Sequence, residues 1–320
     1  DKGIHVTASV PVGIQALNHV VKTTDGYLGL PTSVLGTEYI VQAYGNVQTG
    51  VPSLNGSQFA LVACEPNTTV TIVPSVVTGI RDDGVPYTLT LHQGQTYQLR
   101  NTNDAPADLS GTVITSDKPI AVFGSHRCAN VGSADAFFCD YLVEQLLPVR
   151  DWGMNFAAAL LATRGGGDTF RVLASVDNTT VVTNGVALGT KLNRGQFHEM
   201  KLATPPYITS DHPIFVTQYA NSSDVDLVKE ADPFMVIVPP TKLFNRHHTV
   251  CTADADFPLN YINVVAPAAA VGAVQFDGVA IAAGFFSPIG PSGYFGASVP
   301  VPAPSGPPIL RRSPPAPSAH

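Results

Sequence analysis

Ile114-Thr-Ser-Asp-Lys-Pro119 and Ile208-Thr-Ser-Asp-His-Pro213 are two nearly identical hexapeptides, and an apolar run follows each of them. A more divergent copy, Val6-Thr-Ala-Ser-Val-Pro11, stands near the start of the chain. Successive copies are 108 and 94 residues apart. A motif that recurs at such spacing indicates an internal repeat, and the repeat constrains the architecture before any single element does.

Two further landmarks recur in the same order. One is the proline at Pro31, Pro148 and Pro240, and the other is an apolar segment at residues 59–63, 170–174 and 261–265. Because three unrelated landmarks shift together, the chain is predicted to contain three related units of roughly 100 residues. We place these units at residues 3–113, 114–207 and 208–299, followed by a proline-rich tail at residues 300–320.

Short β-branched segments between clusters of Gly, Pro, Asn and Asp predict strands along almost the whole chain. Asn184-Gly185 and Asp277-Gly278 are hairpin signals at equivalent places in the second and third units. The segment 151–163 is helix-like in composition, but it aligns with a strand pattern of the first unit and is predicted as strand. The predicted fold is all-β, with three small sandwich or jelly-roll-like units; a single propeller-like closed array is the alternative.

The composition narrows the class of protein. Apolar residues make up 44% of the 320 residues and charged residues only 13%, which favours a secreted or surface β protein with ample core. The net charge of −7 argues against a nucleic-acid partner, which would need clustered Lys and Arg. No apolar run reaches the length of a membrane span.

The four cysteines form an even set. Cys128 and Cys139 are close in sequence and flank a loop-like segment, so a disulfide between them is predicted. Cys64 and Cys251 are the other disulfide candidates, although sequence alone does not determine connectivity. Zinc is the competing interpretation, but the close Cys spacing typical of zinc sites is absent. Disulfides would place the chain in an oxidising compartment.

Leu35, Trp152 and Phe244 each lie four residues after the landmark proline of their unit. An apolar residue at equal spacing in every repeat is predicted to pack between repeats, with an aromatic platform for a ligand as the alternative. Asp117 and Asp211 of the repeated hexapeptide are predicted to accept hydrogen bonds from nearby backbone amides.

Four Asn-x-Ser/Thr sequons occur, at Asn55, Asn67, Asn178 and Asn221. In a eukaryotic secreted protein they would be glycosylation sites. The alternative, which we favour, is that Asn-Thr-Thr forms a turn into a β-branched strand.

No residue set predicts catalysis, a cofactor or a metal. The densest group of potential ligands, listed here, is predicted to be an exposed loop: His247, His248, Cys251, Asp254 and Asp256. Ser125 and His126 are adjacent and lack the Gly-x-Ser-x-Gly context of a nucleophile, so a triad is not predicted. The chain also lacks GxGxxG and Walker-type phosphate loops.

Four stretches resemble the family of the N-terminal domain of IgG Fc-binding protein, which includes a secreted mucus protein and bacterial relatives. They are residues 25–39, residues 114–131, residues 139–148 and residues 232–240, and they occur in family order. The resemblance implies an extracellular, disulfide-bearing, non-enzymatic binding or adhesion module, without implying that this chain binds IgG. The departure from the family is at the C-terminus, where proline-rich sequence follows Ser292-Gly-Tyr-Phe295.

The predicted function is therefore extracellular or cell-surface binding or adhesion without catalysis. The expected partner is a protein or glycoprotein, including copies of the chain itself, because open edge strands favour pairing into a surface array or fibre. The alternative is a secreted carbohydrate-binding or carbohydrate-acting protein, which would need exposed aromatic rings and paired carboxylates.

Overall fold

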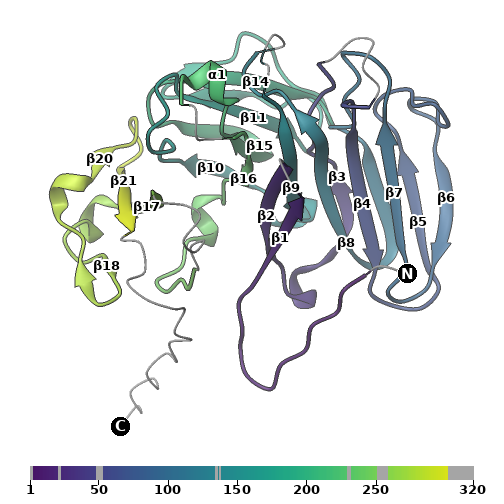
Figure 1. The fold of residues 1–320 in the computed structure, drawn as a ribbon, viewed down its shortest axis with the longest axis horizontal. Coiled ribbons are helices and arrows are strands. Elements are labelled where there is room, and N and C mark those ends of the chain that lie inside the picture. The colour runs from purple at the N-terminus through teal and green to yellow at the C-terminus, as the bar shows by residue number, and fades with distance from the viewer. Residues whose placement is uncertain are drawn as a thin grey trace.

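The computed structural model describes residues 3–20, 23–47, 53–133, 136, 138–228, 232–250 and 259–301. Two seven-stranded antiparallel sheets lie beside each other, and a smaller third unit follows them (Figure 1). Nearly all regular structure is strand, so the predicted all-β class is confirmed. The one α-helix of the described residues, α1, is Ser223–Asp226.

The first sheet is organised around one long strand. Its members are β3 (Gly36–Ile40), β4 (Ser57–Ala63), β5 (Thr68–Val73), β6 (Tyr87–Leu91), β7 (Thr96–Asn101), β8 (Val113–Ala129) and β9 (Asp140–Gln145). The first part of β8 pairs with β3 and β5, and its later part pairs with β4 and β9. One strand of 17 residues thus satisfies hydrogen bonds to four neighbours, because the sheet curls around it.

The second sheet repeats this plan. Its members are β10 (Gly153–Ala157), β11 (Asp168–Ala174), β12 (Val181–Thr183), β13 (Val186–Ala187), β14 (Phe197–Leu202), β15 (Tyr207–Tyr219) and β16 (Met235–Ile237). Its central strand, β15, pairs with β10, β11, β12 and β16. The register is the same in both sheets, since Ala63 lies opposite Ile120 and Ala174 lies opposite Ile214.

The repeated hexapeptide forms the start of each central strand. Asp117 Oδ1 accepts the amide of Thr69 at 2.8 Å, and Asp211 Oδ1 accepts the amide of Thr180 at 2.7 Å. Both carboxylates therefore join the central strand to the turn that leads into the neighbouring strand.

The remaining strands form smaller sheets. They are β1 (Ile14–Val20), β2 (Thr23–Gly29), β17 (Asn260–Pro267), β18 (Gln275–Phe276), β19 (Val279–Ala280), β20 (Ser287–Pro288) and β21 (Tyr294–Val301). β1 pairs with β2, β18 pairs with β19, and β21 lies between β17 and β20. The two hairpins β12–β13 and β18–β19 turn at Asn184-Gly185 and Asp277-Gly278, where all four residues have positive φ.

The landmark prolines begin short 3-10 helices. These helices are Thr32–Val34, Val149–Asp151 and Thr241–Leu243, each capped by its proline; two others are Ala268–Ala270 and Ala283–Phe285. A proline suits this place, because its φ near −65° matches the turn and its missing N–H is not needed there.

The sheets are offset from the predicted units. β8 completes the first sheet although its hexapeptide opens the predicted unit 114–207, and β15 completes the second sheet although it opens the predicted unit 208–299. A repeat can be cut at any phase, so the division at residues 3–113, 114–207 and 208–299 stays a prediction. The described part of the predicted tail extends β21 to Val301, and residues 302–320 lie outside the described residues.

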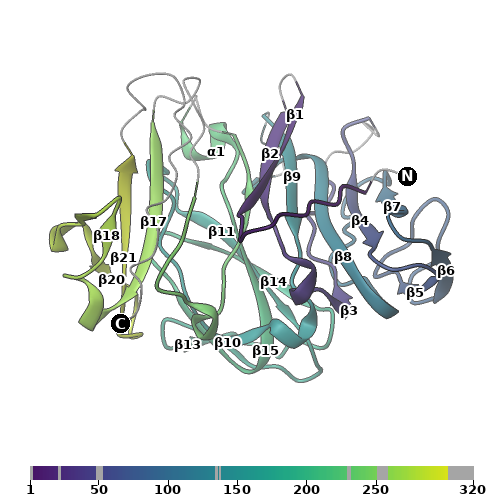
Figure 2. The same cartoon turned by 90° about the horizontal axis from the view of Figure 1, so that it is seen from below.

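The core of the first sheet continues into the second sheet, which also has a buried cluster of its own around Phe170 and Ile214, and the third unit has a separate cluster. Trp152, Leu173, Phe215 and Tyr219 of the second sheet belong to the same buried cluster as the core of the first sheet. A separate small cluster, around Phe286 and its neighbours, belongs to the third unit. Seen from below, β17 and β21 stand apart at one end of the molecule (Figure 2).

Gly124 marks a close approach within the first sheet. A Cβ atom at this position would collide with the carbonyl oxygen of Gln42. In the second sheet the equivalent residue is Gln218, whose amide donates to Ala159 O at 2.9 Å, so only the first copy requires a glycine.

We predict that Gly124→Ala lowers the free energy of unfolding by about 1–3 kcal/mol, because the backbone must shift to admit the methyl group. Gly189→Ala is the matched control, since no atom lies within 4 Å of a Cβ built there, and it should change stability by less than about 0.5 kcal/mol. Chemical denaturation followed by circular dichroism measures both, and equal stabilities would contradict the assignment.

Candidate functional site

The buried cation Arg171 joins the first two sheets. Its Nη1 donates to Asp108 Oδ2 at 2.8 Å and to Ala43 O at 3.1 Å, and its Nε donates to Glu199 Oε2 at 2.7 Å. The guanidinium also lies 4.1 Å from the ring centroid of Tyr44. With two carboxylates, a carbonyl and an aromatic face around it, this charge holds the sheets together and is not presented to a ligand.

His126 is also buried, and both of its ring nitrogens are used. Nε2 lies 2.8 Å from Asn46 Oδ1, and Nδ1 accepts the amide of Cys128 at 3.0 Å. An accepting Nδ1 leaves the proton on Nε2, which donates to Asn46. Burial lowers the pKa of His126 to about 4, so the ring is neutral and acts as a structural group beside Ser125.

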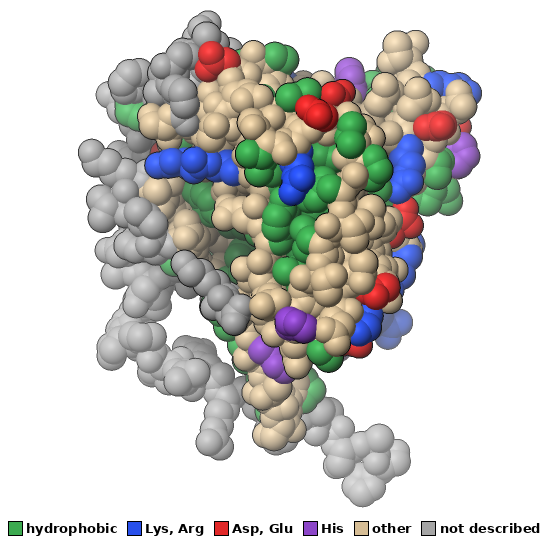
Figure 3. Space-filling view, turned by 90° about the vertical axis from the view of Figure 1, so that its right-hand side faces the viewer, with side chains coloured by type: hydrophobic (Ala, Val, Ile, Leu, Met, Phe, Trp, Pro, Cys, Tyr) green, Lys and Arg blue, Asp and Glu red, His purple; other side chains and the backbone are tan. Residues whose placement is uncertain are grey.

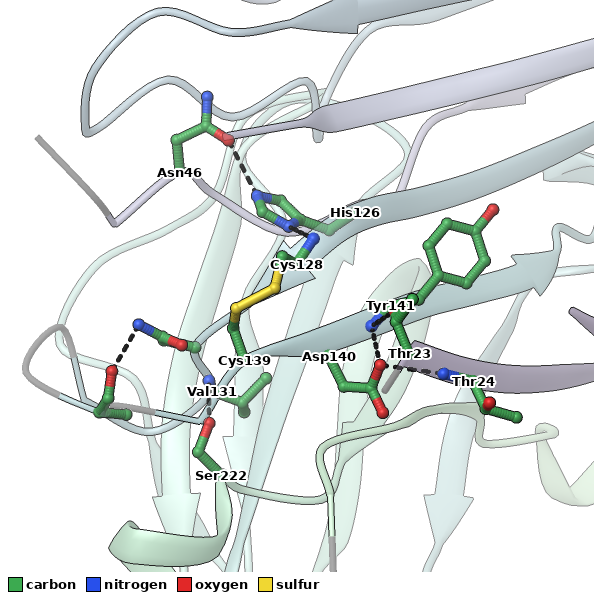
Figure 4. The surroundings of a disulfide bond; sticks show 12 residues. Thr23, Thr24, Asn46, His126, Cys128, Val131, Cys139, Asp140, Tyr141 and Ser222 are labelled. Carbon is green, nitrogen blue, oxygen red and sulfur yellow. Dashed lines mark hydrogen bonds between the residues drawn. A yellow bond between two sulfur atoms is a disulfide. The ribbon is translucent and has the colours of Figure 1, made fainter. Parts of the chain in front are cut away.

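A disulfide joins Cys128 at the end of β8 to Cys139, just before β9 (Figure 4). The loop that it closes contacts the second sheet, because the amide of Val131 donates to Ser222 Oγ and the amide of Ser222 donates to Val131 O, both at 3.1 Å. Cys64 carries a free, half-buried thiol whose pKa is raised by burial. Cys251 lies outside the described residues, so its pairing stays a prediction.

The sequons divide into two kinds. Asn55 and Asn221 are buried, and Asn221 donates to Gly167 O at 2.7 Å and to Asp226 Oδ1 at 3.0 Å. Their amide nitrogens are not accessible in the folded chain, an observation that does not favour the predicted glycosylation of these two residues. Sequence could not show this, since a sequon carries no information on burial.

Asn67 and Asn178 are exposed at equivalent turns, each with positive φ. The next residue in each case is a buried Thr whose hydroxyl donates to the carbonyl three residues back, at 2.8 Å. This geometry supports the turn interpretation, and glycosylation of these two residues stays a prediction.

Leu35 and Trp152 occupy equivalent positions between units. Arg150 donates to Leu35 O at 2.8 Å, and Lys242 donates to Trp152 O at 2.7 Å, so the same contact links unit one to two and two to three. Both apolar side chains are buried, and the Trp152 ring lies 5.2 Å from that of Phe215. The half-buried Phe244 packs on Tyr294 within the third unit, at 5.6 Å.

The predicted exposed loop is described only in part. His247 and His248 are exposed, whereas Cys251, Asp254 and Asp256 lie outside the described residues. Among the residues that are described, no three His, Cys, Asp or Glu side chains are grouped so as to hold a metal ion.

Hydrogen bonds to carboxylates join strand β2 to strand β9. Asp25 Oδ2 accepts the amide of Val143 at 2.9 Å. Figure 4 shows the second contact, in which Asp140 Oδ1 accepts the amide of Thr24 at 3.0 Å. Burial raises the pKa of Asp25 to about 7 despite these amide bonds, and it also raises the pKa values of Asp140 and Glu144. A protonated carboxyl avoids the cost of burying charge, so this junction is expected to be more stable at low pH.

We predict a pH-dependent stability that arises from Asp25. Its folded-state pKa lies above the ordinary value of 3.8, so its contribution is complete below pH 4 and is lost as the pH rises toward 7. Asp25→Asn, which mimics the neutral acid, should remove on the order of 1–3 kcal/mol of this pH dependence. Asp82→Asn at the exposed Asp82 is the control. Denaturant midpoints measured from pH 4 to about 8 test it, and parallel profiles for wild type and Asp25→Asn would contradict it.

The loop between β5 and β6, residues 74–86, is the main exposed apolar feature of the first sheet. Val77, Ile80 and Val85 are 45%, 73% and 56% exposed. The loop is nevertheless ordered, because the amide of Thr78 donates to Arg81 O and the amide of Gly84 donates to Pro74 O, both at 2.8 Å. We call residues 74–86 the apolar loop.

The second sheet has no such loop, since β12 and β13 are joined by Asn184-Gly185 alone. An insertion in one copy that exposes three hydrophobic side chains is typical of a binding loop rather than of a structural connection. The sequence predictions did not include this loop, although the spacing of its strands differs between two otherwise equivalent copies.

Comparison with known proteins gives a family. The model of the family described as IgGFc binding protein matches residues 25–312. The chain belongs to the IgGFc-binding protein family. It is 28% identical over 279 residues to the human IgGFc-binding protein, an alignment that covers 85% of this chain and 5% of the relative. No solved structure matches the chain. No helix among the described residues is long and apolar enough to cross a membrane.

Proposed function

We propose that this chain is an extracellular protein-binding module of adhesive type, without catalysis, and that the apolar loop is its contact surface. Membership of the IgGFc-binding family supports a protein partner and an extracellular location. The loop carries the proposal, because it exposes hydrophobic side chains on a backbone that is already ordered. Preorganisation lowers the entropy cost of association.

The side of the molecule formed by the first sheet suits a protein partner. On this side, shown in Figure 3, hydrophobic side chains form a band, and charged side chains lie around it. An interface of this kind depends on apolar burial more than on charge steering, so its affinity should be nearly independent of salt.

Catalytic and carbohydrate functions have less support. The buried ionisable groups Arg171 and His126 are engaged in structural hydrogen bonds. Trp152, the single tryptophan of the chain, is buried and donates to Leu147 O at 3.1 Å, so its ring is not available to stack on a sugar. These observations favour protein binding over the carbohydrate alternative.

The test is a binding measurement with defined probes. The chain is immobilised and probed with purified IgG Fc fragment, the ligand in the family's name, and separately with a second copy of the chain. We expect saturable, salt-insensitive binding of at least one probe that weakens about tenfold or more in Ile80→Asp and in Val85→Asp. Val186→Asp, at the exposed tip of the equivalent hairpin β12–β13, is the matched control and should bind normally. Binding of neither probe, or equal binding by all variants, would contradict the proposal.

Self-association is the second candidate, because within the described residues only β21 pairs with β17, which leaves the other edge of that strand open. Light scattering coupled to size-exclusion chromatography should then show a mass that increases with concentration. A strict monomer at the highest attainable concentration would contradict assembly of the chain with itself.

A further inference from the structure

The pair β1–β2 has the register of the two central pairs, β8–β9 and β15–β16. Opposed residues are Ala16 and Tyr27, Gly124 and Glu144, and Gln218 and Val236. In each pair the first residue lies five positions after the proline of the repeated hexapeptide, and the second lies four positions before the landmark proline. β1 is therefore equivalent to the central strands β8 and β15, and β2 is equivalent to their partners β9 and β16.

In the N-terminal segment that contains β1, two apolar positions of the repeat are exposed. Five residues before the hexapeptide proline, Ile114 and Ile208 are 0% and 1% exposed, but Val6 is 52% exposed. One residue after that proline, Ile120 and Ile214 are both 0% exposed, but Val12 is 57% exposed. The sequence preserves hydrophobic side chains at two positions that this segment does not bury.

The third unit, conversely, lacks a central strand among the described residues. β4 lies between β7 and β8, and β11 lies between β14 and β15, whereas β17 pairs only with β21. The first two sheets therefore have a strand on the edge that β17 leaves open.

A cavity of about 3310 Å³ lies beside that open edge. Its walls include Leu28 and Leu30 at the end of β2, Val236 and Ile237 of β16, and Val264 of β17. A seven-residue strand at normal strand and sheet spacings occupies on the order of 1100 Å³, so the cavity can admit one.

We propose that the segment from Val6 to Val20 is the central strand of the third sheet, and that it pairs with β17 of the same molecule in a closed form. The same molecule is the favoured donor because β2 already lines this cavity, and the β1–β2 ladder ties the donor strand to it. A tethered strand has a higher effective concentration than the strand of another copy.

The register of the closed form follows from the other two sheets. The amide of Ala63 donates to Gln95 O, and the amide of Ala174 donates to Gln196 O. On the other edge, Ala63 pairs with Ile120 and Ala174 pairs with Ile214. Gln95 and Gln196 each follow a positive-φ glycine, as does Tyr294, which lies opposite Pro267. Pro267 therefore takes the place of the two alanines and pairs with Val12, two residues further along than the sequence alignment of 261–265 with 59–63 places it.

Two residues further along, Ile14 lies opposite Val265. The equivalent pairs in the complete sheets are Val122 with Leu61 and Val216 with Val172. Opposed residues of an antiparallel pair have Cα atoms about 4.5–5.5 Å apart, which is within the range that a disulfide spans. The proposal can therefore be tested by cross-linking.

The experiment uses the full chain with Cys64 and Cys251 changed to serine. Ile14→Cys with Val265→Cys is oxidised and examined by non-reducing electrophoresis and peptide mass spectrometry. We expect a disulfide within the monomer. The control, Asn18→Cys with Val265→Cys, moves the thiol about 13 Å along the strand and should not cross-link. Disulfide-linked dimers, or free thiols in a normally folded Ile14→Cys/Val265→Cys variant, would overturn closure within one molecule.

Hydrogen exchange provides a second measurement in case the cysteine variant misfolds. Closure predicts that Val12→Asp speeds exchange of β17 amides about tenfold or more, whereas Val279→Asp at the exposed tip of the β18–β19 hairpin leaves it unchanged. Equal exchange in Val12→Asp and wild type would overturn the proposal. The result is independent of the apolar loop, so binding through residues 74–86 and strand closure succeed or fail separately.

Discussion

The structure depends on the pairing of one central strand with four neighbours. β8 and β15 each form hydrogen bonds with strands on both edges, and each changes partners along its length. A strand used in this way must be long, and its apolar side chains must be buried, as at Ile120 and Ile214. Loss of this strand would leave the other strands of its sheet without a common partner, since β3, β4, β5 and β9 all pair with β8 in the first sheet.

The units are joined by contacts that recur with the repeat. The basic side chain two residues after Pro148 and after Pro240, Arg150 or Lys242, donates to the carbonyl of the buried residue of the preceding unit. Pro148 and Pro240 also pack where Gly36 and Gly153 leave room. Asn245 holds the corresponding place in the third unit, so that unit has lost the small residue on which a proline could pack. The glycine of each unit receives the proline of the following unit, so this difference leaves the contact between Gly153 and Pro240 intact.

The first two sheets share the same strand pairing but differ in the loops that connect their strands. The connection between β5 and β6 is the apolar loop in one copy and a two-residue turn in the other, although the strands on either side keep their register. Placing a binding surface on such a connection leaves the core pairing undisturbed, because neither end of the loop has to move. The proposed protein binding is thus compatible with a rigid scaffold and a variable edge.

The repeat, the all-β class and the hairpin turns were determined by sequence alone, because each depends on local patterns such as Asn184-Gly185 and the hexapeptide ending at Pro119. Equal spacing from the landmark proline also predicted packing of Trp152, and its side chain is buried in the structure.

Only the tertiary structure decided which polar groups are buried and which strand completes each sheet. Asn55 and Asn67 are equivalent as sequons, but one is buried and the other is exposed, because burial is set by neighbours that are distant in sequence. The same reason explains the offset between repeats and sheets: hydrogen bonding joins β8 to strands that precede it, and a periodic sequence does not show where one sheet ends and the next begins.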